Sequence, residues 1–466
     1  MPAYDYDLAI LGSGPAGSMA AVEAGRRGKK VALIERAKDL GGAGINTGTL
    51  PSKTLRESAL HLSGFGQRGL DEVELGLSRE QISVAQFLAR KRRVVRNELA
   101  LLREMLEGLH VEVLHGSGCF VDAHTLAIDG ARRITAEKIL IATGSRPRRP
   151  AGFPFDDPDV VDSDTILELE RIPDTLTVVG GGVIGCEYAS VFAALGVKVT
   201  LLESHPTLLG FLDVEIRTLL QRRFEALGIE FLFNDDVLKV VDVPGPGVAV
   251  ETRAGKRFSA GKLLVAAGRM SNVEGLGLEA IGLAPDARGR LVVDANYQTP
   301  VPGVYAAGDL LGFPALASTG MEQGRLAVCH AFGETDESVR VETLPYGLYT
   351  IPEVGYVGLN EEECRAKQIV YEIGRARYGE NARGQIVGDL DGLLKILFRP
   401  GDRTILGVHI VGEQATELVH LGQLAMQLGG TLETFARACF NFPTLSVLYK
   451  RAAFDGLQRL TPPGQG

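Results

Sequence analysis

One local pattern of about 30 residues occurs twice in this chain, and it limits what the chain can fold into. Residues 6–36 and 175–204 each begin with an apolar run, pass through a glycine-rich turn into a helical run, and end in a second apolar run. A strand, a tight turn, a helix and a second strand form a βαβ unit, whose two strands lie parallel in one sheet. The repeat therefore predicts an α/β fold that contains two such units.

The first repeat carries the residue types that a dinucleotide site needs. In "YDLAILGSGPAG" the apolar run ends at Gly12, Gly14 and Gly17, and the second run, "KVALIE", ends at Glu35. Gly12 permits a tight turn, Gly14 lets the backbone approach a pyrophosphate, and Gly17 lets the helix pack on the strand. The helix start attracts phosphate, and Glu35 can accept hydrogen bonds from ribose hydroxyls. These residues predict a first dinucleotide-binding site.

The second repeat has the same layout and also indicates which nucleotide it prefers. Gly180, Gly182 and Gly185 occupy its turn, and Glu203 ends its second apolar run. A carboxylate there accepts the free 2′-hydroxyl of NAD(H) and repels the 2′-phosphate of NADP(H). Residues 204–207 read Ser-His-Pro-Thr, so no Arg or Lys follows to pair with a phosphate. We expect NAD(H) to bind here in preference to NADP(H).

The C-terminal quarter of the chain has a different character. Residues 340–466 contain no glycine-rich nucleotide turn, and they alternate strand-like runs such as "TILGVHIVG" with helical runs such as "ATELVHLGQLAMQLGG". That alternation is typical of an α+β module. The sequence therefore predicts an α/β protein with two Rossmann-like dinucleotide-binding domains and a C-terminal α+β domain.

Charge and hydropathy exclude several classes of partner. The net charge is −9 and no long basic block occurs, which disfavours nucleic acid as a partner. The one basic cluster, residues 90–96, is expected to lie on a solvated helix face. No run of about 18 apolar residues predicts a membrane span, and the N-terminus lacks a signal-peptide pattern. We expect a cytoplasmic protein.

The five cysteines show neither a metal-binding nor a disulfide spacing. Cys119, Cys186, Cys329, Cys364 and Cys439 are scattered along the chain, without a CxxC pair. We expect single buried thiols and no metal site.

Several longer segments carry a resemblance that covers essentially the whole chain. They are "GGAGINTGTLPSKTLRE", "IATGSRPRRP", "GGGVIGCEYASVFAALG", "AAGRMSN", "VYAAGDLLGFPALAS" and "LYTIPEVGYVG". Together they resemble the flavoprotein disulfide reductase family, the class I pyridine nucleotide-disulfide oxidoreductases. Within it the chain is most similar to the soluble pyridine nucleotide transhydrogenases.

The resemblance implies cofactors, domain limits and residue roles. It implies FAD in the first domain (residues 1–145 and 272–335), NAD(P) in the second (146–271), and a homodimer formed through residues 340–466. Lys53 and Glu187 are implied to form an ion pair beside the flavin, the alternative being two separate surface charges. Val183 occupies the position of a residue that gates the nicotinamide pocket in relatives. Further cofactor contacts are implied for Gly118, Thr143, Gly144, Asp309, Ala315, Leu316, Ala317 and Ser318 on FAD, and for Val237 and Gly268 on NAD.

The chain departs from the family where the disulfide chemistry resides. Members that reduce disulfides have two cysteines spaced C-x4-C before the "PSK" segment, and here those positions are Gly44 and Thr49. A C-terminal His and Glu that move a proton in those members are replaced by Phe442 and Val447. The joint loss of all four residues implies an electron acceptor other than a disulfide.

Three readings of the function follow. The first is FAD-dependent hydride exchange with a second nicotinamide nucleotide as acceptor, as in a transhydrogenase. The second is an NADH-dependent diaphorase that reduces a quinone, because small and apolar residues replace the dithiol machinery. The third is a nucleotide-binding protein without redox activity, which the fold alone permits.

Overall fold

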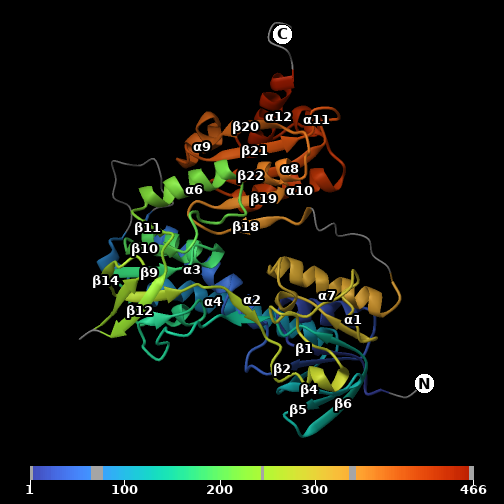
Figure 1. The fold of residues 1–466 in the computed structure, drawn as a ribbon. Coiled ribbons are helices and arrows are strands. Elements are labelled where there is room, and N and C mark those ends of the chain that lie inside the picture. The colour runs from blue at the N-terminus through green and yellow to red at the C-terminus, as the bar shows by residue number, and fades with distance from the viewer. Residues whose placement is uncertain (1–3, 65–76, 243–245, 335–342, 461–466) are drawn as a thin grey trace.

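Three α/β units make up the computed structural model, which describes residues 4–64, 77–242, 246–334 and 343–460. In Figure 1 the N-terminal unit lies at the lower right, the second unit at the left, and the C-terminal unit at the top. This architecture confirms the predicted fold class. The predicted domain limits remain predictions, and residues 335, 340–342 and 461–466 lie outside the described part of the chain.

The first sheet has seven strands in the order β3-β2-β1-β6-β5-β4, and β17 also pairs with β6. Strands β3, β2, β1, β6 and β17 are parallel, while β4 and β5 extend β6 as an antiparallel hairpin. Nearly every residue of β1 is buried, which explains its continuous apolar run. The strands are β1 (Tyr6–Leu11), β2 (Val31–Glu35), β3 (Glu112–His115), β4 (Gly118–Asp122), β5 (Thr125–Ile128), β6 (Arg132–Ile141) and β17 (Val304–Ala306).

The second sheet is fully parallel and follows the order β11-β10-β9-β15-β8. A separate antiparallel sheet, β12-β13-β14, belongs to the same stretch of chain, and the short β7-β16 pair stands between the two nucleotide units in sequence. The strands are β7 (Ser145–Pro147), β8 (Val160–Val161), β9 (Thr175–Val179), β10 (Lys198–Glu203), β11 (Glu230–Phe233), β12 (Val237–Asp242), β13 (Val248–Thr252), β14 (Arg257–Ala260), β15 (Lys262–Val265) and β16 (Arg269–Ser271).

The C-terminal unit contains one antiparallel sheet in the order β18-β19-β22-β21-β20. Strands β21 and β22 are buried along their whole length, and helices α10 and α12 pack against the sheet. Its elements are β18 (Tyr346–Leu348), β19 (Val354–Gly358), α8 (Glu361–Ala366), β20 (Glu372–Arg377), α9 (Ala382–Val387), β21 (Leu393–Phe398), β22 (Ile405–Val411), α10 (Ala415–Gln427), α11 (Leu432–Arg437) and α12 (Val447–Leu460).

Helices of the nucleotide units bring distant parts of the chain together. Helix α1 follows the first glycine-rich turn and packs along α7, which lies beside it in Figure 1 although about 300 residues separate them. Helix α3 contacts α5, which follows the second glycine-rich turn. The helices are α1 (Pro15–Arg26), α2 (Gly42–Ile45), α3 (Thr49–Leu62), α4 (Val84–Gly108), α5 (Val183–Ala194), α6 (Val214–Ala226) and α7 (Ala317–Ala331).

Two expectations about individual side chains are partly wrong. Helix α4 does expose most of its basic cluster, but Lys91 is buried, because its ammonium donates to the Leu167 carbonyl (2.7 Å) and the Glu168 carboxylate (2.9 Å). Three cysteines are buried thiols as expected, whereas Cys119 is half-buried and Cys439 is exposed. None of these five cysteines, all within the described residues, forms a disulfide. Among the described residues, no helix is both long and apolar enough to cross a membrane.

A buried charged cluster joins the second unit to the C-terminal sheet. The fully buried Lys395 ammonium, on β21, lies 2.8 Å from Asp213 Oδ1 and 3.3 Å from Glu215 Oε2, and it also contacts Glu361. The ammonium occupies the centre of these carboxylates, so the acidic group is an ion-pair network and not an open cation site. Burial acts against both charges but is outweighed: His409 and the Lys395 ammonium lower the pKa of Asp213, and Asp213 and Glu361 raise the pKa of Lys395.

Replacing Lys395 with Met should destabilise the fold by about 3–5 kcal/mol at neutral pH, because it leaves buried carboxylates without a partner. Asp213 has a lowered pKa in the folded state, so the contribution of the pair is present above the unfolded value of about 4 and is lost at lower pH. Thermal melts of K395M and the parent protein check this. The gap between them should be wide at pH 7 and should shrink as the pH falls below about 4, and an equal gap at both pH values would contradict it.

Candidate functional site

The first glycine-rich turn is built so tightly that side chains are excluded at two of its positions. Gly12 has a φ of +100°, and a Cβ there would lie 2.5 Å from the Ala142 carbonyl oxygen. A Cβ at Gly17 would lie 1.9 Å from the Gly12 carbonyl oxygen, so α1 can pack this closely only with glycine there. At Gly14 a Cβ would meet nothing within 4 Å, and this residue borders open space.

The second turn repeats this geometry. Gly180 has a φ of +105°, and its Cβ would lie 2.5 Å from the Ala266 carbonyl oxygen. A Cβ at Gly185 would lie 1.9 Å from the Gly180 carbonyl oxygen, and Gly182 again borders open space. Neither α1 nor α5 has a side-chain N-cap, so the N–H groups of both first turns are left for a ligand.

The acidic residue that ends the second strand stabilises the turn in both units. The Glu35 carboxylate accepts from the Ser13 N–H (2.9 Å) and the Ser13 hydroxyl (2.6 Å), and the Glu203 carboxylate accepts from the Gly181 N–H (2.6 Å). Burial acts to raise the pKa of Glu203, but hydrogen bonds from His205, Gly181 and Ser204 outweigh it and lower the pKa. Glu203 is therefore a carboxylate at neutral pH.

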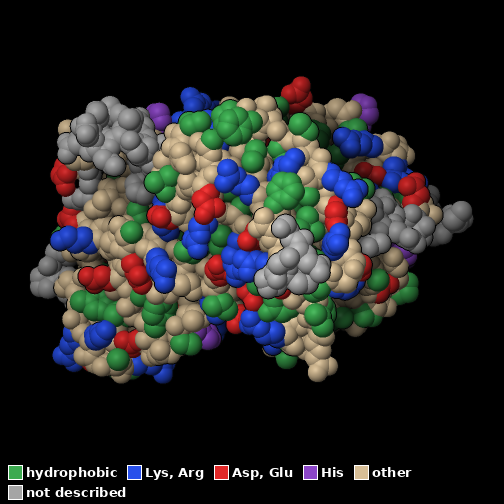
Figure 2. All heavy atoms as spheres, turned by 90° about the horizontal axis from the view of Figure 1, so that it is seen from above, with side chains coloured by type: hydrophobic (Ala, Val, Ile, Leu, Met, Phe, Trp, Pro, Cys, Tyr) green, Lys and Arg blue, Asp and Glu red, His purple; other side chains and the backbone are tan. Residues whose placement is uncertain are grey.

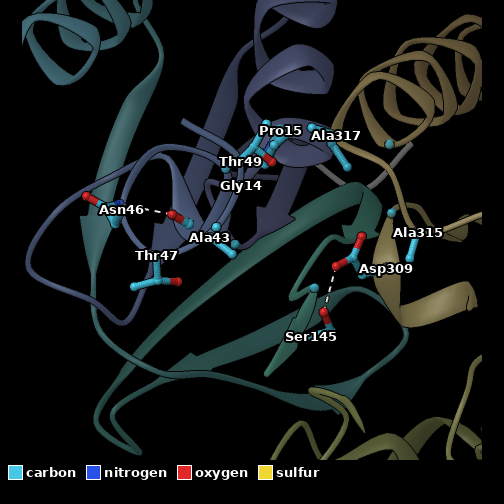
Figure 3. A pocket seen from close by; sticks show the side chains of 18 of the residues that line it. Gly14, Pro15, Ala43, Asn46, Thr47, Thr49, Ser145, Asp309, Ala315 and Ala317 are labelled. Carbon is cyan, nitrogen blue, oxygen red and sulfur yellow. Dashed lines mark hydrogen bonds between the residues drawn. The ribbon is translucent and has the colours of Figure 1, made fainter. Parts of the chain in front are cut away.

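A large cavity opens at the carboxyl ends of the strands of the first sheet. Its volume is about 1060 Å³, larger than a typical single-ligand pocket. Figure 3 shows that three segments far apart in sequence meet there: Gly14 and Pro15, the loop through Ala43, Asn46, Thr47 and Thr49, and the segment from Asp309 to Ala317.

The cavity gathers most of the expected flavin-site residues. Of the predicted residues, its lining includes Gly12, Gly14, Glu35, Lys53, Gly118, Thr143, Gly144, Val183, Glu187, Asp309, Ala315, Leu316, Ala317 and Ser318. Gly17 is outside the lining because it packs against Gly12.

The residues expected for the nicotinamide nucleotide do not line this cavity. They are Gly180, Gly182, Gly185, Glu203, Val237 and Gly268. Backbone contacts keep this group together: Gly180 abuts Ala266 and Ala267, and the Asp235 N–H donates to the Glu203 carbonyl. The second unit reaches the cavity through the first two turns of α5, at Val183, Ile184, Glu187 and Tyr188.

Asp309 belongs to a polar chain at the cavity wall. Its Oδ2 atom accepts from the Ser145 hydroxyl (2.6 Å), which Figure 3 marks with a dashed line. The Ser145 oxygen in turn accepts from Arg269 Nε (2.7 Å), and Arg269 also lines the cavity. Asp309 is therefore held by the β7–β16 pair that joins the two nucleotide units.

Lys53 and Glu187 form the expected ion pair and are not separate surface charges. Lys53 Nζ lies 2.6 Å and 2.8 Å from the two carboxylate oxygens of Glu187, with one partner on α3 and the other on α5. A contact that the sequence did not predict comes from the C-terminal unit, where the Tyr349 N–H donates to Glu187 Oε1 (2.9 Å). The Lys53 ammonium also lies 4.9 Å from the centre of the Tyr349 ring.

Of the four positions that depart from the dithiol pattern, only two lie in the cavity wall. Gly44 and Thr49 line it, and neither carries a thiol. A Cβ at Gly44 would lie 2.6 Å from Pro15 Cγ, so Pro15 already fills the space beside it. Phe442, which is 70% exposed, and the half-buried Val447 are not part of the lining.

Sequence reasoning missed several residues of the cavity wall. Asp164 lines it, and burial raises the pKa of its carboxyl group. The C-terminal unit contributes a further set: Pro345, Gly347, Tyr349, Thr416, Val419 and His420. The helical residues His330 and His420 hydrogen-bond to Tyr305 and Gln423, respectively. Nothing in the local sequence indicated that β18 and α10 reach a nucleotide site.

The residues present fit a bound flavin dinucleotide. An uncapped helix start and the bare Gly14 leave space and N–H groups for a pyrophosphate, and Glu35 lies at the end of the adjacent strand. The uncapped N-terminus of α7, at Leu316, reaches the same cavity. Its partial positive charge suits the electron-rich end of an isoalloxazine.

One dinucleotide turn lines the cavity, and the helix that follows the second dinucleotide turn reaches it, with an ion pair between the two units. This arrangement defines an enzyme that uses FAD and a nicotinamide nucleotide for electron transfer. Residues 6–324 match the pyridine nucleotide-disulphide oxidoreductase family, and residues 344–453 match the dimerisation domain of that family. The chain belongs to this family.

Known proteins resemble the chain over almost its full length. It is 46% identical over 461 residues to a soluble pyridine nucleotide transhydrogenase from Mycobacterium tuberculosis, covering 98% of each chain. Among solved structures, LpdA from Mycobacterium tuberculosis superposes with a TM-score of 0.89 at 29% identity, covering 98% of this chain and 99% of LpdA. The HOCl-induced flavoprotein disulfide reductase RclA from Escherichia coli gives a TM-score of 0.87 at 26% identity, covering 96% and 99%.

The Glu35→Gln variant should retain FAD less tightly, with Kd raised about tenfold to a hundredfold. It removes the charged acceptor of two hydrogen bonds from Ser13, each worth about 1.5–3 kcal/mol when its acceptor is charged. The measurement is fluorescence titration of the apoprotein with FAD. Ser13→Ala is the matched control, since it removes only the hydroxyl bond and should have a smaller effect. If E35Q binds FAD as tightly as the parent protein, the carboxylate does not organise this turn.

Proposed function

We propose that this chain is an FAD-dependent pyridine nucleotide transhydrogenase that moves hydride between nicotinamide nucleotides without a redox disulfide. The observation that carries the proposal is the single cavity lined from both nucleotide units, with the Lys53–Glu187 pair at their junction. The similarity to soluble transhydrogenases over nearly the whole chain supports it. In the balanced reaction NADH and NADP⁺ give NAD⁺ and NADPH, so neither a thiol nor a free proton is required.

FAD supplies the chemistry when bound, because it can accept a hydride equivalent and return it. The chain's own residues orient the bound cofactors and stabilise the charge that develops on them. Lys53 places a fixed positive charge in the cavity, and Glu187 holds that charge against α5. Val183, at the first position of α5, is small enough to leave the entrance for a nicotinamide ring open. We propose these roles for the cavity residues, together with the FAD and NAD contacts expected from the sequence.

The proposal includes NAD(H) as the preferred nucleotide of the second unit, with NADP(H) as the other substrate. The carboxylate of Glu203 lies at the end of β10, with no Arg or Lys in the four residues that follow. The side chain of the next ionisable residue, His205, contacts the same carboxylate (2.6 Å) and is 79% exposed. The NADP(H) half of the reaction must therefore proceed against an unfavourable charge at this site.

We also propose that the chain works as a homodimer in the cytoplasm. The match to a dimerisation domain supports the dimer, as do exposed apolar side chains on α10, directly after α10, in the loop between α11 and α12, and on α12: Leu424, Leu428, Phe442 and Phe454. Figure 2 looks down on the C-terminal end of the molecule, where apolar side chains stand among acidic and basic ones. The relatives' description as soluble supports the location.

An NADH-dependent diaphorase that reduces quinones is the second candidate. Gly44 and Thr49 favour it, because the cavity wall carries no thiol at these positions. A flat acceptor bound there would have only small residues beside it. Anaerobic NADH followed by thio-NADP⁺ or a soluble quinone separates the two functions. A transhydrogenase reduces the thionicotinamide with high efficiency, whereas a diaphorase strongly favours the quinone. A flavin that NADH and NADPH both fail to bleach would rule out both functions.

Removing the positive charge at the cavity should slow flavin reduction. We expect Lys53→Met to lower the rate constant of anaerobic flavin reduction by NADH about 100-fold, because a preorganised charge beside the reacting group is lost. Stopped-flow absorbance measures the rate. Arg92→Met, on the exposed face of α4, is the control and should leave the rate unchanged. Equal rates in K53M and the parent protein would remove Lys53 from the mechanism.

A change of charge at Glu203 should alter nucleotide preference. Glu203→Gln keeps an acceptor for the Gly181 N–H but removes the negative charge, so we expect kcat/KM for NADPH relative to NADH to rise about tenfold. Glu203→Ala removes charge and acceptor together and should impair the use of both nucleotides. Steady-state kinetics with each nucleotide tests this. An unchanged ratio in E203Q would mean that this carboxylate does not face the 2′-position.

A further inference from the structure

A short loop of the C-terminal unit, residues 349–353 between β18 and β19, is held by side chains from three helices. Helices α3 and α5 belong to the nucleotide units, and α10 belongs to the C-terminal unit. The loop also provides the Tyr349 N–H that contacts Glu187 at the cavity. Whatever fixes this loop therefore also affects the Lys53–Glu187 pair.

Helix α3 holds the loop through Arg56. Because Lys53 and Arg56 are three residues apart, they project from the same face of α3. Arg56 Nε donates to the Thr350 carbonyl (3.0 Å), and Arg56 Nη2 lies 3.1 Å from Glu353 Oε1. The side chains of this ion pair are only 4% and 9% exposed. Arg56 Nη1 also donates to the exposed Glu57.

Helix α5 also holds the loop through two residues that are three positions apart, Glu187 and Ser190. Glu187 accepts from the Tyr349 N–H (2.9 Å), and the Ser190 hydroxyl oxygen accepts from the Ile351 N–H (3.1 Å). Glu187 Oε1 is shared between this N–H and the Lys53 ammonium. A displacement of Tyr349 would therefore let the carboxylate rotate, and Lys53 would move with it.

Helix α10 completes the arrangement at Glu353. The second oxygen of this carboxylate accepts from the Thr416 N–H (3.1 Å) and the Thr416 hydroxyl (2.7 Å). The Glu353 carbonyl accepts from the Gly412 N–H (2.9 Å). Glu353 thus ties α3 to α10 through one buried carboxylate, although neither Arg56 nor Glu353 lines the cavity.

We infer that Arg56 and Glu353 are positioning residues: their buried ion pair fixes the loop whose Tyr349 N–H orients Glu187, and so sets the place of the Lys53 ammonium at the flavin site. A buried ion pair is a weak source of stability, because desolvation of both charges offsets their attraction. The ion pair instead fixes the loop in one position, because Arg56 can contact both Glu353 and the Thr350 carbonyl only when the loop lies there. The inference rests on the proposed function, in which the charge of Lys53 faces the flavin.

The test compares the flavoprotein with its Glu353→Gln and Arg56→Lys variants. E353Q keeps the size of the side chain but removes its charge, and R56K keeps the charge but loses the planar group that reaches two acceptors. We expect both variants to reduce flavin with NADH about tenfold more slowly, with KM for NADH within about twofold of the parent value. The flavin midpoint potential should become more negative, because a displaced ammonium stabilises the charge gained on reduction less well.

One further measurement, hydrogen exchange, does not depend on catalysis. Hydrogen exchange over residues 346–354 should become faster in both variants, because the Tyr349 and Ile351 amides lose fixed acceptors. Asp213→Asn is the matched control. It removes the charge of one partner in a different buried ion pair, Asp213–Lys395, which joins the second unit to the C-terminal unit away from the cavity, and Asn can still cap α6. D213N should lower the melting temperature but leave the flavin potential, the reduction rate and this exchange unchanged.

The inference is overturned if E353Q and R56K merely melt at lower temperature, as D213N should, with potential, rate and exchange as in the parent protein. Failure of the proposed function is a different result. In that case the parent flavoprotein itself is not reduced by NADH or NADPH, and the exchange and potential measurements still decide whether Arg56 and Glu353 position Lys53.

Discussion

The contact between Lys53 and Glu187 is the interaction on which the arrangement of the nucleotide units depends. It joins α3, which begins at Thr49 in the cavity wall, to α5, which follows the second glycine-rich turn and reaches the cavity with its first residues. The pair is stable only while both charges keep their partners, because an unpaired charge in that position would cost several kcal/mol. The C-terminal unit supplies the third contact, through the backbone of Tyr349. All three units thus converge on one carboxylate.

The two nucleotide turns have almost the same geometry, because both need a close approach of backbone that only glycine permits. In both, the first glycine has a positive φ and faces a carbonyl at 2.5 Å from its missing Cβ, and the third faces a carbonyl at 1.9 Å. In both, the acidic residue at the end of the second strand accepts from the N–H that follows the first glycine. The acid therefore stabilises its own turn, in addition to the ribose contact that the sequence predicts. The contact with the turn was not evident from the sequence.

The sequence predicted the local features because each follows from residues that are close together in the chain. The βαβ repeats, the turns at Gly12 and Gly180 and the acids at Glu35 and Glu203 depend on neighbours within about 30 residues. The basic cluster on α4 was only partly predicted. Periodicity places Lys91 on a helix, but its burial depends on a carbonyl at residue 167 that the chain brings to it only on folding. The lining by β18 and α10 was missed for the same reason.

By itself, the sequence determined that the chain builds two parallel-sheet units with dinucleotide turns, followed by a C-terminal unit of another kind, and that Gly44 and Thr49 carry no thiol. Residue type and spacing determine such properties, because a tight turn with a positive φ needs glycine wherever it occurs. Tertiary structure alone decided that residues of the C-terminal unit face the cavity, and that Arg56 and Glu353 meet across about 300 residues. Long-range pairing depends on how the three units pack together, and no local spacing of residues determines that packing.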